Sequence, residues 1–392
     1  MAVAIGRVSL RAEALADLRD DFDELRFLCD GAGLDAGHPL RSELDATPTV
    51  PRRDRVATQL RREYALRAAL LTADEWQSPA IGAGIRAHVD DYKRDRHASA
   101  SAYERMYVRE LVGAPDVRAF STSCGMAALT TILAFLSADG PVLLGRASYH
   151  ETKDLVLGRF GDCAIEVDDT DLPDAISALD PAAVFVDSLC NSRGLVVPPL
   201  DRILGSARGW VVVDNTCLGP ACRPFDSRAP KLLVWESLLK LAQFGLDRAN
   251  AGILLARGPE VDELDTLRER LGTNVPDTAI ASLPPPERKR LSRRLARLER
   301  NAAILAERLG GFHPGAGPIL QVDVADPKRW IERALAEARR RGVQVVHGTS
   351  FGFDHTRVYV TAPGPDSFLR IAPGTEDRLR IETVAETLDA AR

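Results

Sequence analysis

The stretch KLLVWESLLKLAQFG occupies residues 231–245 and places a lysine, Lys240, among mostly apolar side chains. Its first half, KLLVWES, is a short apolar run of the kind that forms a buried strand. A buried ammonium without a partner costs several kcal/mol, so Lys240 either reaches water or serves as something other than a solvated charge. The segments on either side of this stretch help to decide between the two.

Similar apolar runs lie on both sides and alternate with helical patterns. The runs are PVLLG, AAVFVDS, GWVVVDN and AGILLAR, and the helical patterns include GMAALTTILAFLS, HETKDLVLGRF and LPDAISAL. Continuously apolar strands that alternate with helices are typical of a parallel sheet covered on both faces. The sequence therefore predicts an α/β fold with a mainly parallel sheet.

The chain changes character on both sides of this region. Residues 1–91 carry apolar residues at three- and four-residue spacing, as in ALADLRDDFDELRFL, and predict a helical N-terminal extension. Residues 92–258 hold the predicted sheet. Residues 259–392 begin with basic helical sequence and end in strand-like pieces and a last helix. We expect them to form a smaller α+β C-terminal domain.

Composition narrows the class of protein. The chain has 392 residues and a formal net charge of -5, which gives no reason to expect nucleic acid or an anionic membrane as a partner. No apolar run reaches the roughly 18–20 residues of a membrane span, and the N-terminus lacks the apolar core of a signal peptide. The six cysteines lack paired spacing, so we expect reduced thiols, no metal site and a cytoplasmic location.

Polar residues end several of the apolar runs. They are Asp187, Asn191, Asp214, Ser237 and Lys240. In open α/β sheets, ligands bind at the carboxyl ends of the strands, so these side chains are the first candidates for a site. Their types include an acid and an amine.

The segment STSCGMAAL adds an anion site. A turn of small residues followed at once by a helix offers free backbone N–H groups and a positive dipole end, which usually binds phosphate. An amine, an acid and a phosphate site at one sheet edge are what pyridoxal phosphate requires. A lysine held as an imine carries no lone ammonium, which would explain Lys240.

These segments resemble the Cys/Met-metabolism family of fold-type-I pyridoxal-phosphate enzymes, which includes cystathionine synthases and lyases and methionine gamma-lyase. The resemblance covers roughly residues 92–392, in order. It is carried by DYKRDRHASASAYERMYVREL, FSTSCGMAAL, ASYHETKDL, VDSLCNS, VVVDNTCLGP, WESLLK, GTSFGFDHT and LRIAPGTED. The resemblance implies the fold-type-I transferase architecture and a homodimer or homotetramer whose active site is shared between subunits.

The resemblance also implies which residues bind the cofactor. Gly125, Met126 and Ser237 would hold the phosphate, and Lys240 would form the Schiff base. Asp214 would pair with the ring nitrogen. The full implied set is Gly125, Met126, Tyr149, Asn191, Asp214, Thr216, Ser237, Lys240, Tyr92 and Arg94.

The other residues of that set have roles nearer the substrate or the neighbouring subunit. Tyr149 would stack on the cofactor ring, and Asn191 would face its 3-hydroxyl group. Tyr92 and Arg94 would reach the phosphate of the neighbouring subunit. The implied catalytic residues are Lys240, Tyr149 and Tyr92, and the implied substrate-binding residues are Arg370, which would hold a carboxylate, and Ser350.

The sequence departs from the family at several of these segments. Leu239 stands where the family has a threonine, His150 and Glu151 replace two glycines, and Ser192 replaces the proline after Asn191. These changes indicate a diverged member and leave the substrate more open than the cofactor.

The expected reaction is β- or γ-elimination or replacement on an α-amino acid, as in a carbon–sulfur lyase or a transsulfuration enzyme. Two alternatives remain. The same chemistry could act on an unusual, for example halogenated, amino acid of specialised metabolism, or the protein could be an aminotransferase. Each residue also has an ordinary explanation: Lys240 could reach solvent at a strand end, Asp214 could cap a turn, and Arg370 could form a structural ion pair.

Overall fold

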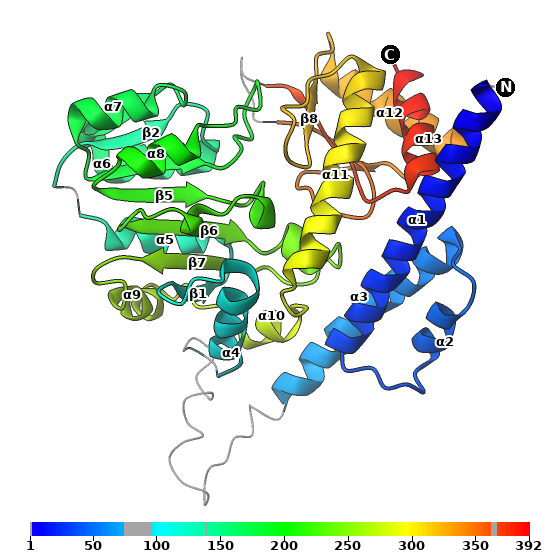
Figure 1. Cartoon of the computed structure of the whole chain (residues 1–392), viewed down its shortest axis with the longest axis horizontal. Helices are drawn as coiled ribbons and strands as arrows, with labels where there is room; N and C mark the ends of the chain where they lie inside the picture. Colours follow the sequence, from blue (N-terminus) through cyan, green and yellow to red (C-terminus); the bar gives the residue numbers. More distant parts are fainter. Residues whose placement is uncertain (1, 74–95, 97, 138, 362–366) are drawn as a thin grey trace, which may run out of the picture. The chain divides into compact units, whose positions relative to one another are not determined.

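The computed structural model describes residues 2–73, 96, 98–137, 139–361 and 367–392 (Figure 1). It divides into two compact units. The first, which we call the terminal unit, contains Met1–Arg67, Gln243–Asp247 and Lys289–Arg392. The second, the central unit, contains Ala68–Ala242 and Arg248–Arg288.

The central unit is built on a seven-stranded sheet with the order β1-β7-β6-β5-β4-β2-β3. The five strands from β6 to β3 are parallel, whereas β7 runs antiparallel to both β6 and β1. The strands are β1 (Arg118–Thr122), β2 (Val142–Gly145), β3 (Ala164–Val167), β4 (Ala183–Asp187), β5 (Trp210–Asp214), β6 (Leu232–Ser237) and β7 (Gly252–Arg257).

Helices cover both faces of this sheet. One hydrophobic core packs the sheet against α5, α6 and α9, and the other packs it against α4, α7, α8 and α10. Because both faces are covered, every residue of β4 is buried. The helices are α4 (Ala98–Tyr107), α5 (Gly125–Phe135), α6 (His150–Phe160), α7 (Leu172–Leu179), α8 (Leu200–Ser206), α9 (Glu263–Leu271) and α10 (Asp277–Ala281).

Short helical turns complete the central unit and its connections. They are η3 (Val108–Val112), η4 (Gly161–Cys163), η5 (Gly219–Ala221), η6 (Pro224–Asp226) and η7 (Leu241–Gln243). The last of these follows Lys240 directly.

The terminal unit has a four-stranded sheet with the order β8-β11-β10-β9. Its core joins this sheet to three C-terminal helices. These strands are β8 (Leu320–Val322), β9 (Val346–His347), β10 (Arg357–Val360) and β11 (Leu369–Ala372), and the helices are α11 (Arg288–Leu309), α12 (Pro327–Arg341) and α13 (Arg378–Asp389).

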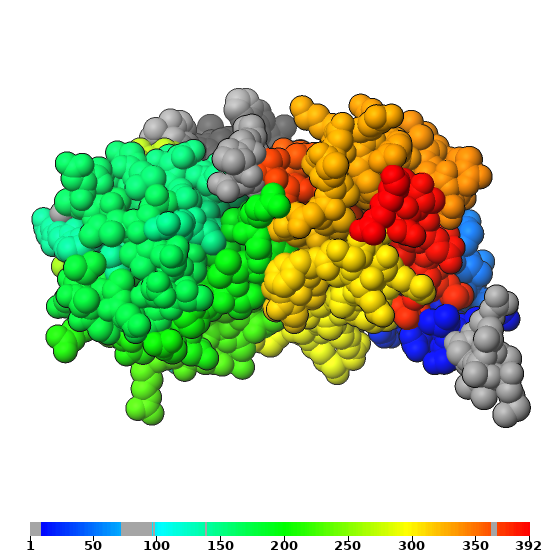
Figure 2. Space-filling view, turned by 90° about the horizontal axis from the view of Figure 1, so that it is seen from above, coloured from blue at the N-terminus to red at the C-terminus, as the bar shows by residue number. Residues whose placement is uncertain are grey.

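The N-terminal helices belong to this same unit up to Arg67, in the last part of α3. They are α1 (Ala2–Gly31), α2 (Pro39–Asp45) and α3 (Val50–Ala73). Figure 2 shows the blue surface of α1 near the red surface of α13, and the two helices contact each other. Arg300 joins α11 to α1, because its guanidinium donates to both carboxylate oxygens of Asp17 at 2.9 Å.

The predicted α/β fold is confirmed, and so is the mainly parallel sheet. The compact units do not follow the three predicted segments 1–91, 92–258 and 259–392, because the N-terminal helices group with the C-terminal part. No helix among the described residues is long and apolar enough to span a membrane. All six cysteines are free, and the described residues contain no cluster of side chains able to hold a metal ion.

Candidate active site

Two neighbouring strands of the central unit end in the acid and the hydroxyl predicted for the site. Asp214 is the last residue of β5 and Ser237 the last of β6. Thr216 links the two ends: its N–H donates to Asp214 Oδ1 at 2.9 Å, and its Oγ1 accepts from the Ser237 N–H at 3.0 Å. The structure therefore brings these three predicted residues together.

The charge of Lys240 acts on Asp214. Burial raises the pKa of Asp214 to about 6, while hydrogen bonds from Thr216 and the positive charge of Lys240 oppose the rise. Lys240 follows Ser237, the last residue of β6, by three positions, so its backbone lies at this same carboxyl end of the sheet.

The start of α5 lies against the end of β6. Gly125 and Met126 are its first residues, and the sulfur of the N-cap Cys124 accepts the Ala127 N–H at 3.3 Å. A Cβ on Gly125 would lie 3.1 Å from the Ser237 Cβ, so glycine permits this close approach. The first N–H groups of a helix have no intrahelical acceptor, so Gly125 and Met126 can donate to an anion beside Ser237.

Tyr149 is held at the same sheet edge through Asp187, a strand-end candidate to which the family resemblance assigns no role. Its N–H donates to Asp187 Oδ2 at 3.0 Å, and Asp187 pairs in register with Asp214. Burial and the neighbouring Asp214 charge raise the pKa of Asp187 well above its usual value. The position of Asp187 at a strand end was the available signal. The His150 ring packs edge-on against Tyr149 at 4.6 Å, and both His150 and Glu151 are exposed.

The sequence did not reveal a second group of polar side chains at the ends of β5 and β6. This group lies beside the hydrophobic core that contains Tyr107. Glu236 accepts from the Tyr107 hydroxyl at 2.6 Å and from Asn215 Nδ2 at 2.8 Å. Burial raises the pKa of Glu236 to about 7, although both hydrogen bonds oppose the rise. Glu236 and Asn215 directly adjoin Ser237 and Asp214, so this group supports the backbone of the candidate site.

The remaining predicted residues lie elsewhere. Asn191 is partly exposed in the loop after β4. Arg370, on β11 of the terminal unit, is buried and donates from Nη2 to the Ser350 carbonyl at 3.3 Å. Those two predicted substrate-binding residues therefore contact each other. Tyr92 and Arg94 lie outside the described residues.

Comparison with known proteins identifies the family. The family model described as Cys/Met metabolism PLP-dependent enzyme matches residues 71–314, more than half of the chain. The chain belongs to this family. The resemblance inferred from the short segments is therefore confirmed, and the match begins after most of the N-terminal helical region.

Solved structures of the same fold agree with this assignment. Cystathionine gamma synthase from Xanthomonas oryzae pv. oryzae is 22% identical, with a TM-score of 0.64 over 77% of this chain and 89% of that one. A methionine gamma lyase from Micromonospora echinospora is 21% identical, with a TM-score of 0.62 over 76% and 87%. At these identities the likeness establishes the fold-type-I architecture.

A curated relative is a fungal protein described as a bifunctional enzyme, flvA, from Aspergillus flavus. It is 28% identical over 245 residues, which cover 53% of this chain and 30% of the fungal protein. The chain therefore spans less than a third of that relative's length.

Proposed function

We propose that this family member binds pyridoxal phosphate at the β5–β6 edge of the central unit and eliminates or replaces a group on the β or γ carbon of an α-amino acid. The observation that carries the proposal is the hydrogen-bonded link from Asp214 through Thr216 to Ser237, with Lys240 three residues beyond Ser237. An amine beside an acid at the carboxyl end of a sheet is the arrangement that this cofactor requires.

The residues present fit the cofactor. The Gly125 backbone approaches Ser237 so closely that a Cβ would press on the Ser237 Cβ and the Trp235 ring, each at 3.1 Å. The first turn of α5 can therefore hold a phosphate together with the hydroxyl of Ser237. Asp214, with a pKa of about 6, is mostly ionised at neutral pH and can accept a hydrogen bond from a protonated pyridine nitrogen.

Bound pyridoxal phosphate supplies an aldehyde for the amine and a pyridinium that withdraws electrons from the substrate's α carbon. Lys240 Nζ would hold the cofactor through its aldehyde carbon, and the lysine amine, once the substrate amine replaced it there, would take the α proton of the substrate. Asp214 would keep the ring nitrogen protonated. Tyr149 is the nearest candidate acid for the leaving group, and Asn191 would bind the 3-hydroxyl group.

The substrate carboxylate would bind Arg370. A guanidinium matches a carboxylate bidentately, which a lysine would not. Arg370 is 4% exposed and its hydrogen bond to the Ser350 carbonyl fixes one edge of the guanidinium. Ser350 itself has a φ of 76°, a strained backbone conformation that is common at functional sites.

The proposed assembly is a homodimer or homotetramer in the cytoplasm. Tyr92 and Arg94 would complete the phosphate site of the neighbouring subunit, with Tyr92 assisting catalysis, as the family resemblance implies. The six free cysteines agree with a reducing compartment.

The deciding experiment incubates the full chain, loaded with pyridoxal phosphate, with amino acids that carry sulfur, oxygen or halogen leaving groups. Products are followed by mass spectrometry with and without a 2-oxo acid. Elimination gives ammonia and a 2-oxo acid, and replacement gives a substituted amino acid, without any amino acceptor. Turnover only with added 2-oxo acid would identify an aminotransferase instead.

One observation favours an unusual substrate. His150, which replaces a family glycine, packs its ring on Tyr149 and is exposed. An imidazole beside the proposed acid could recognise a polar or activated side chain that the common sulfur amino acids lack. Turnover of a halogenated substrate in preference to cystathionine, lost in His150→Gly, would support this alternative.

A further inference from the structure

Residues 146–149, which we call the Tyr149 loop, join β2 to α6 and carry the proposed acid. Two backbone N–H groups of this loop donate to side chains from other segments of the central unit. The Tyr149 N–H donates to Asp187 Oδ2 at 3.0 Å, and the Ala147 N–H donates to Asp169 Oδ2 at 2.8 Å. Both acids are only 4% exposed. Two buried carboxyl groups therefore hold the backbone that carries the Tyr149 ring.

Asp169 follows β3 and lies in a space that a glycine provides. A Cβ on Gly145, the last residue of β2, would overlap Asp169 Oδ1 and lie 3.1 Å from its Cγ. A larger residue there would push the carboxyl group away from the Tyr149 loop. Burial raises the pKa of Asp169, and the hydrogen bond from the Ala147 N–H opposes the rise. The glycine and this hydrogen bond together fix the position of the carboxyl group.

The other oxygen of Asp169 contacts the loop after β4. The Cys190 thiol donates to Asp169 Oδ1 at 3.5 Å, a length that the large sulfur atom permits. Cys190 is fully buried, and its N–H donates to the Val196 carbonyl at 2.8 Å. Burial and the charges of Asp187 and Asp169 raise the pKa of the Cys190 thiol well above its usual value. The thiol therefore keeps the proton that it donates.

Asp169 thus connects two loops of the proposed cofactor site. One of its oxygens accepts from the Tyr149 loop, and the other accepts from the residue directly before Asn191. Tyr149 and Asn191 would contact the same ring, the first by stacking on it and the second at its 3-hydroxyl group. Their separation matters, because a misplacement of about 1 Å can cost about a hundredfold in rate. The family resemblance gives no role to Asp169 or Cys190.

We propose that Asp169 is a positioning residue for Tyr149 and Asn191. By accepting from both loops, its carboxyl group sets their separation, and Cys190 fixes the carboxyl group in turn. The inference rests on the proposed function, since that function brings the cofactor ring to Tyr149 and Asn191. Asp169 and Cys190 act on the ring only through these two loops.

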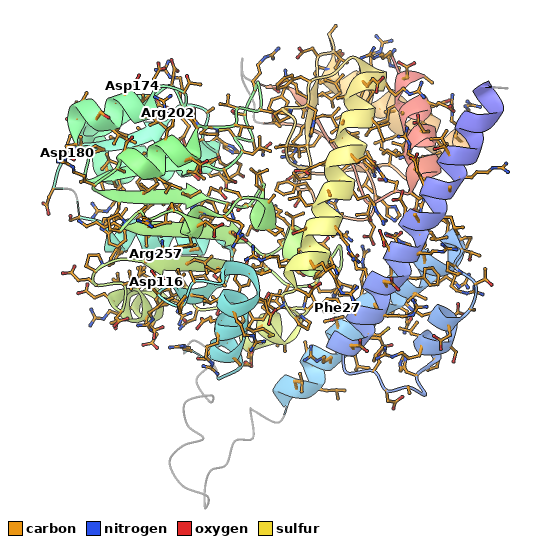
Figure 3. All side chains as sticks on the ribbon, viewed as in Figure 1. Phe27, Asp116, Asp174, Asp180, Arg202 and Arg257 are labelled. Atoms are coloured by element: carbon orange, nitrogen blue, oxygen red, sulfur yellow. The ribbon has the colours of Figure 1, made fainter. Side chains whose placement is uncertain are left out.

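The test compares Asp169→Ala, Asp169→Asn and Cys190→Ala with the control Asp174→Asn in the full chain. Figure 3 labels Asp174 of α7 and Arg202 of α8, whose ion pair of 3.4 Å lies at the surface. Asp174→Asn therefore removes an exposed carboxylate of the same unit and leaves the Tyr149 loop intact.

Four measurements separate positioning from general stability. Hydrogen exchange of the cofactor-free chain reports the protection of the amides in the Tyr149 loop and at Asn191. Absorption titration reports the affinity for pyridoxal phosphate, and visible circular dichroism reports the asymmetry of the groups around the bound ring. Urea unfolding reports the global stability, so that a variant that is merely less stable is recognised.

We expect Asp169→Ala to lower the protection of the Ala147 and Tyr149 amides and the cofactor affinity by about tenfold each, the effect of one lost hydrogen bond. Its visible circular dichroism band should weaken. Asp169→Asn keeps an oxygen for the Ala147 N–H and should recover most of the affinity. Cys190→Ala should lower the affinity by about threefold and reduce the protection at Asn191, because it frees only one side of the carboxyl group. Asp174→Asn should match wild type.

Two results would overturn the inference. The first is lost protection at Ala147 alone, with the affinity and circular dichroism of wild type, since Asp169 would then stabilise only its own contact. The second is an equal change in Asp174→Asn. If Asp169→Ala does not fold, Cys190→Ala carries the test, and wild-type affinity and circular dichroism in that variant would reject the positioning role.

A different measurement recognises failure of the proposed function, because Lys240→Ala would then still hold the cofactor covalently. If Lys240→Ala loses the covalent link while Asp169→Ala and Cys190→Ala bind the cofactor as wild type does, the function stands and the positioning role falls.

Discussion

Asp187 and Asp214 occupy paired positions on the adjacent parallel strands β4 and β5, and burial raises the pKa of both carboxyl groups. Asp187 is 4% exposed, and besides its burial the negative charge of Asp214 raises its pKa. Two neighbouring carboxylates avoid ionising together, and these two hold different backbone groups: Asp187 accepts the Tyr149 N–H and Asp214 accepts the Thr216 N–H. The two acids therefore have different tasks.

The first prediction separates these tasks. Asp187→Asn should leave the affinity for pyridoxal phosphate within a few-fold of wild type, because an amide oxygen can still accept the Tyr149 N–H. Asp214→Asn should weaken binding by about tenfold to a hundredfold, since a charge-assisted hydrogen bond contributes about 1.5–3 kcal/mol. Absorption titrations measure both constants. Equal losses in the two variants would mean that Asp187 is also ionised.

The second prediction concerns pH and Glu236. Its pKa rises from 4.5 to about 7 on folding, so its contribution to stability is complete below pH about 4.5 and is lost as pH rises through about 7. Glu236→Gln cannot ionise and should remove about 1–3 kcal/mol of this pH dependence, allowing for partial exposure. Urea unfolding between pH 4.5 and 8 measures the slope. An unchanged slope in Glu236→Gln would contradict the raised pKa.

The third prediction uses two glycines. Gly125→Ala should lower cofactor affinity by tenfold or more, about 1.4 kcal/mol, because its Cβ would press on Ser237 at 3.1 Å and displace the first turn of α5. Gly158 in α6 is the matched control, since a Cβ there would meet no neighbouring atom within 4 Å. Gly158→Ala should stabilise the helix by about 0.5–1 kcal/mol and leave binding unchanged. Thermal unfolding with cofactor titration distinguishes the two effects.

The fourth prediction concerns the buried ions of the terminal unit. Burial alone would raise the pKa of Asp354, but Arg53 and Arg294 lower it below its usual value. The resulting stability is present above pH about 3.8 and is lost as pH falls through the lowered pKa. Asp354→Asn leaves two guanidinium groups without their shared partner and should cost about 3–5 kcal/mol.

Asp23→Asn is the control for this variant. Asp23 pairs with Arg26 at 2.9 Å on the exposed face of α1, where an ion pair contributes about 0.2–1 kcal/mol. Chemical unfolding at pH 7 and pH 3 measures both variants. If Asp354→Asn proved as mild as Asp23→Asn, the buried network would have little effect on stability.

The sequence predicted the central sheet and the residues at its edge because both depend on local order. The apolar runs that end in Asp214 and Ser237 are strands whose register brings those ends together, and GMAAL starts α5 as expected. The partners that come from distant segments were not predictable. Tyr107 reaches Glu236 across the sheet core, and no periodicity in either segment encodes that contact.

The N-terminal region shows the same limit. Its helices were predicted from amphipathic spacing, but their partners were not. Asp17 and Phe27 contact residues of α11 and of the turn at Phe244, segments that lie far along the chain. The acidic residues of α1 and the basic residues of α11 are visible in the sequence, but the sequence does not show which acid pairs with which arginine.

The terminal unit is assembled from the beginning, the middle and the end of the chain. During synthesis, α1 and α3 therefore emerge long before Arg294, Asp354 and β11, and their contacts with those segments form only after the segments have been translated. Shortening the gene from its 3′ end should leave ribosome products whose N-terminal helices are exposed to chaperones and proteases. The time needed to synthesise residues 289–392 thus sets how long residues 1–67 lack these contacts and remain accessible to proteases.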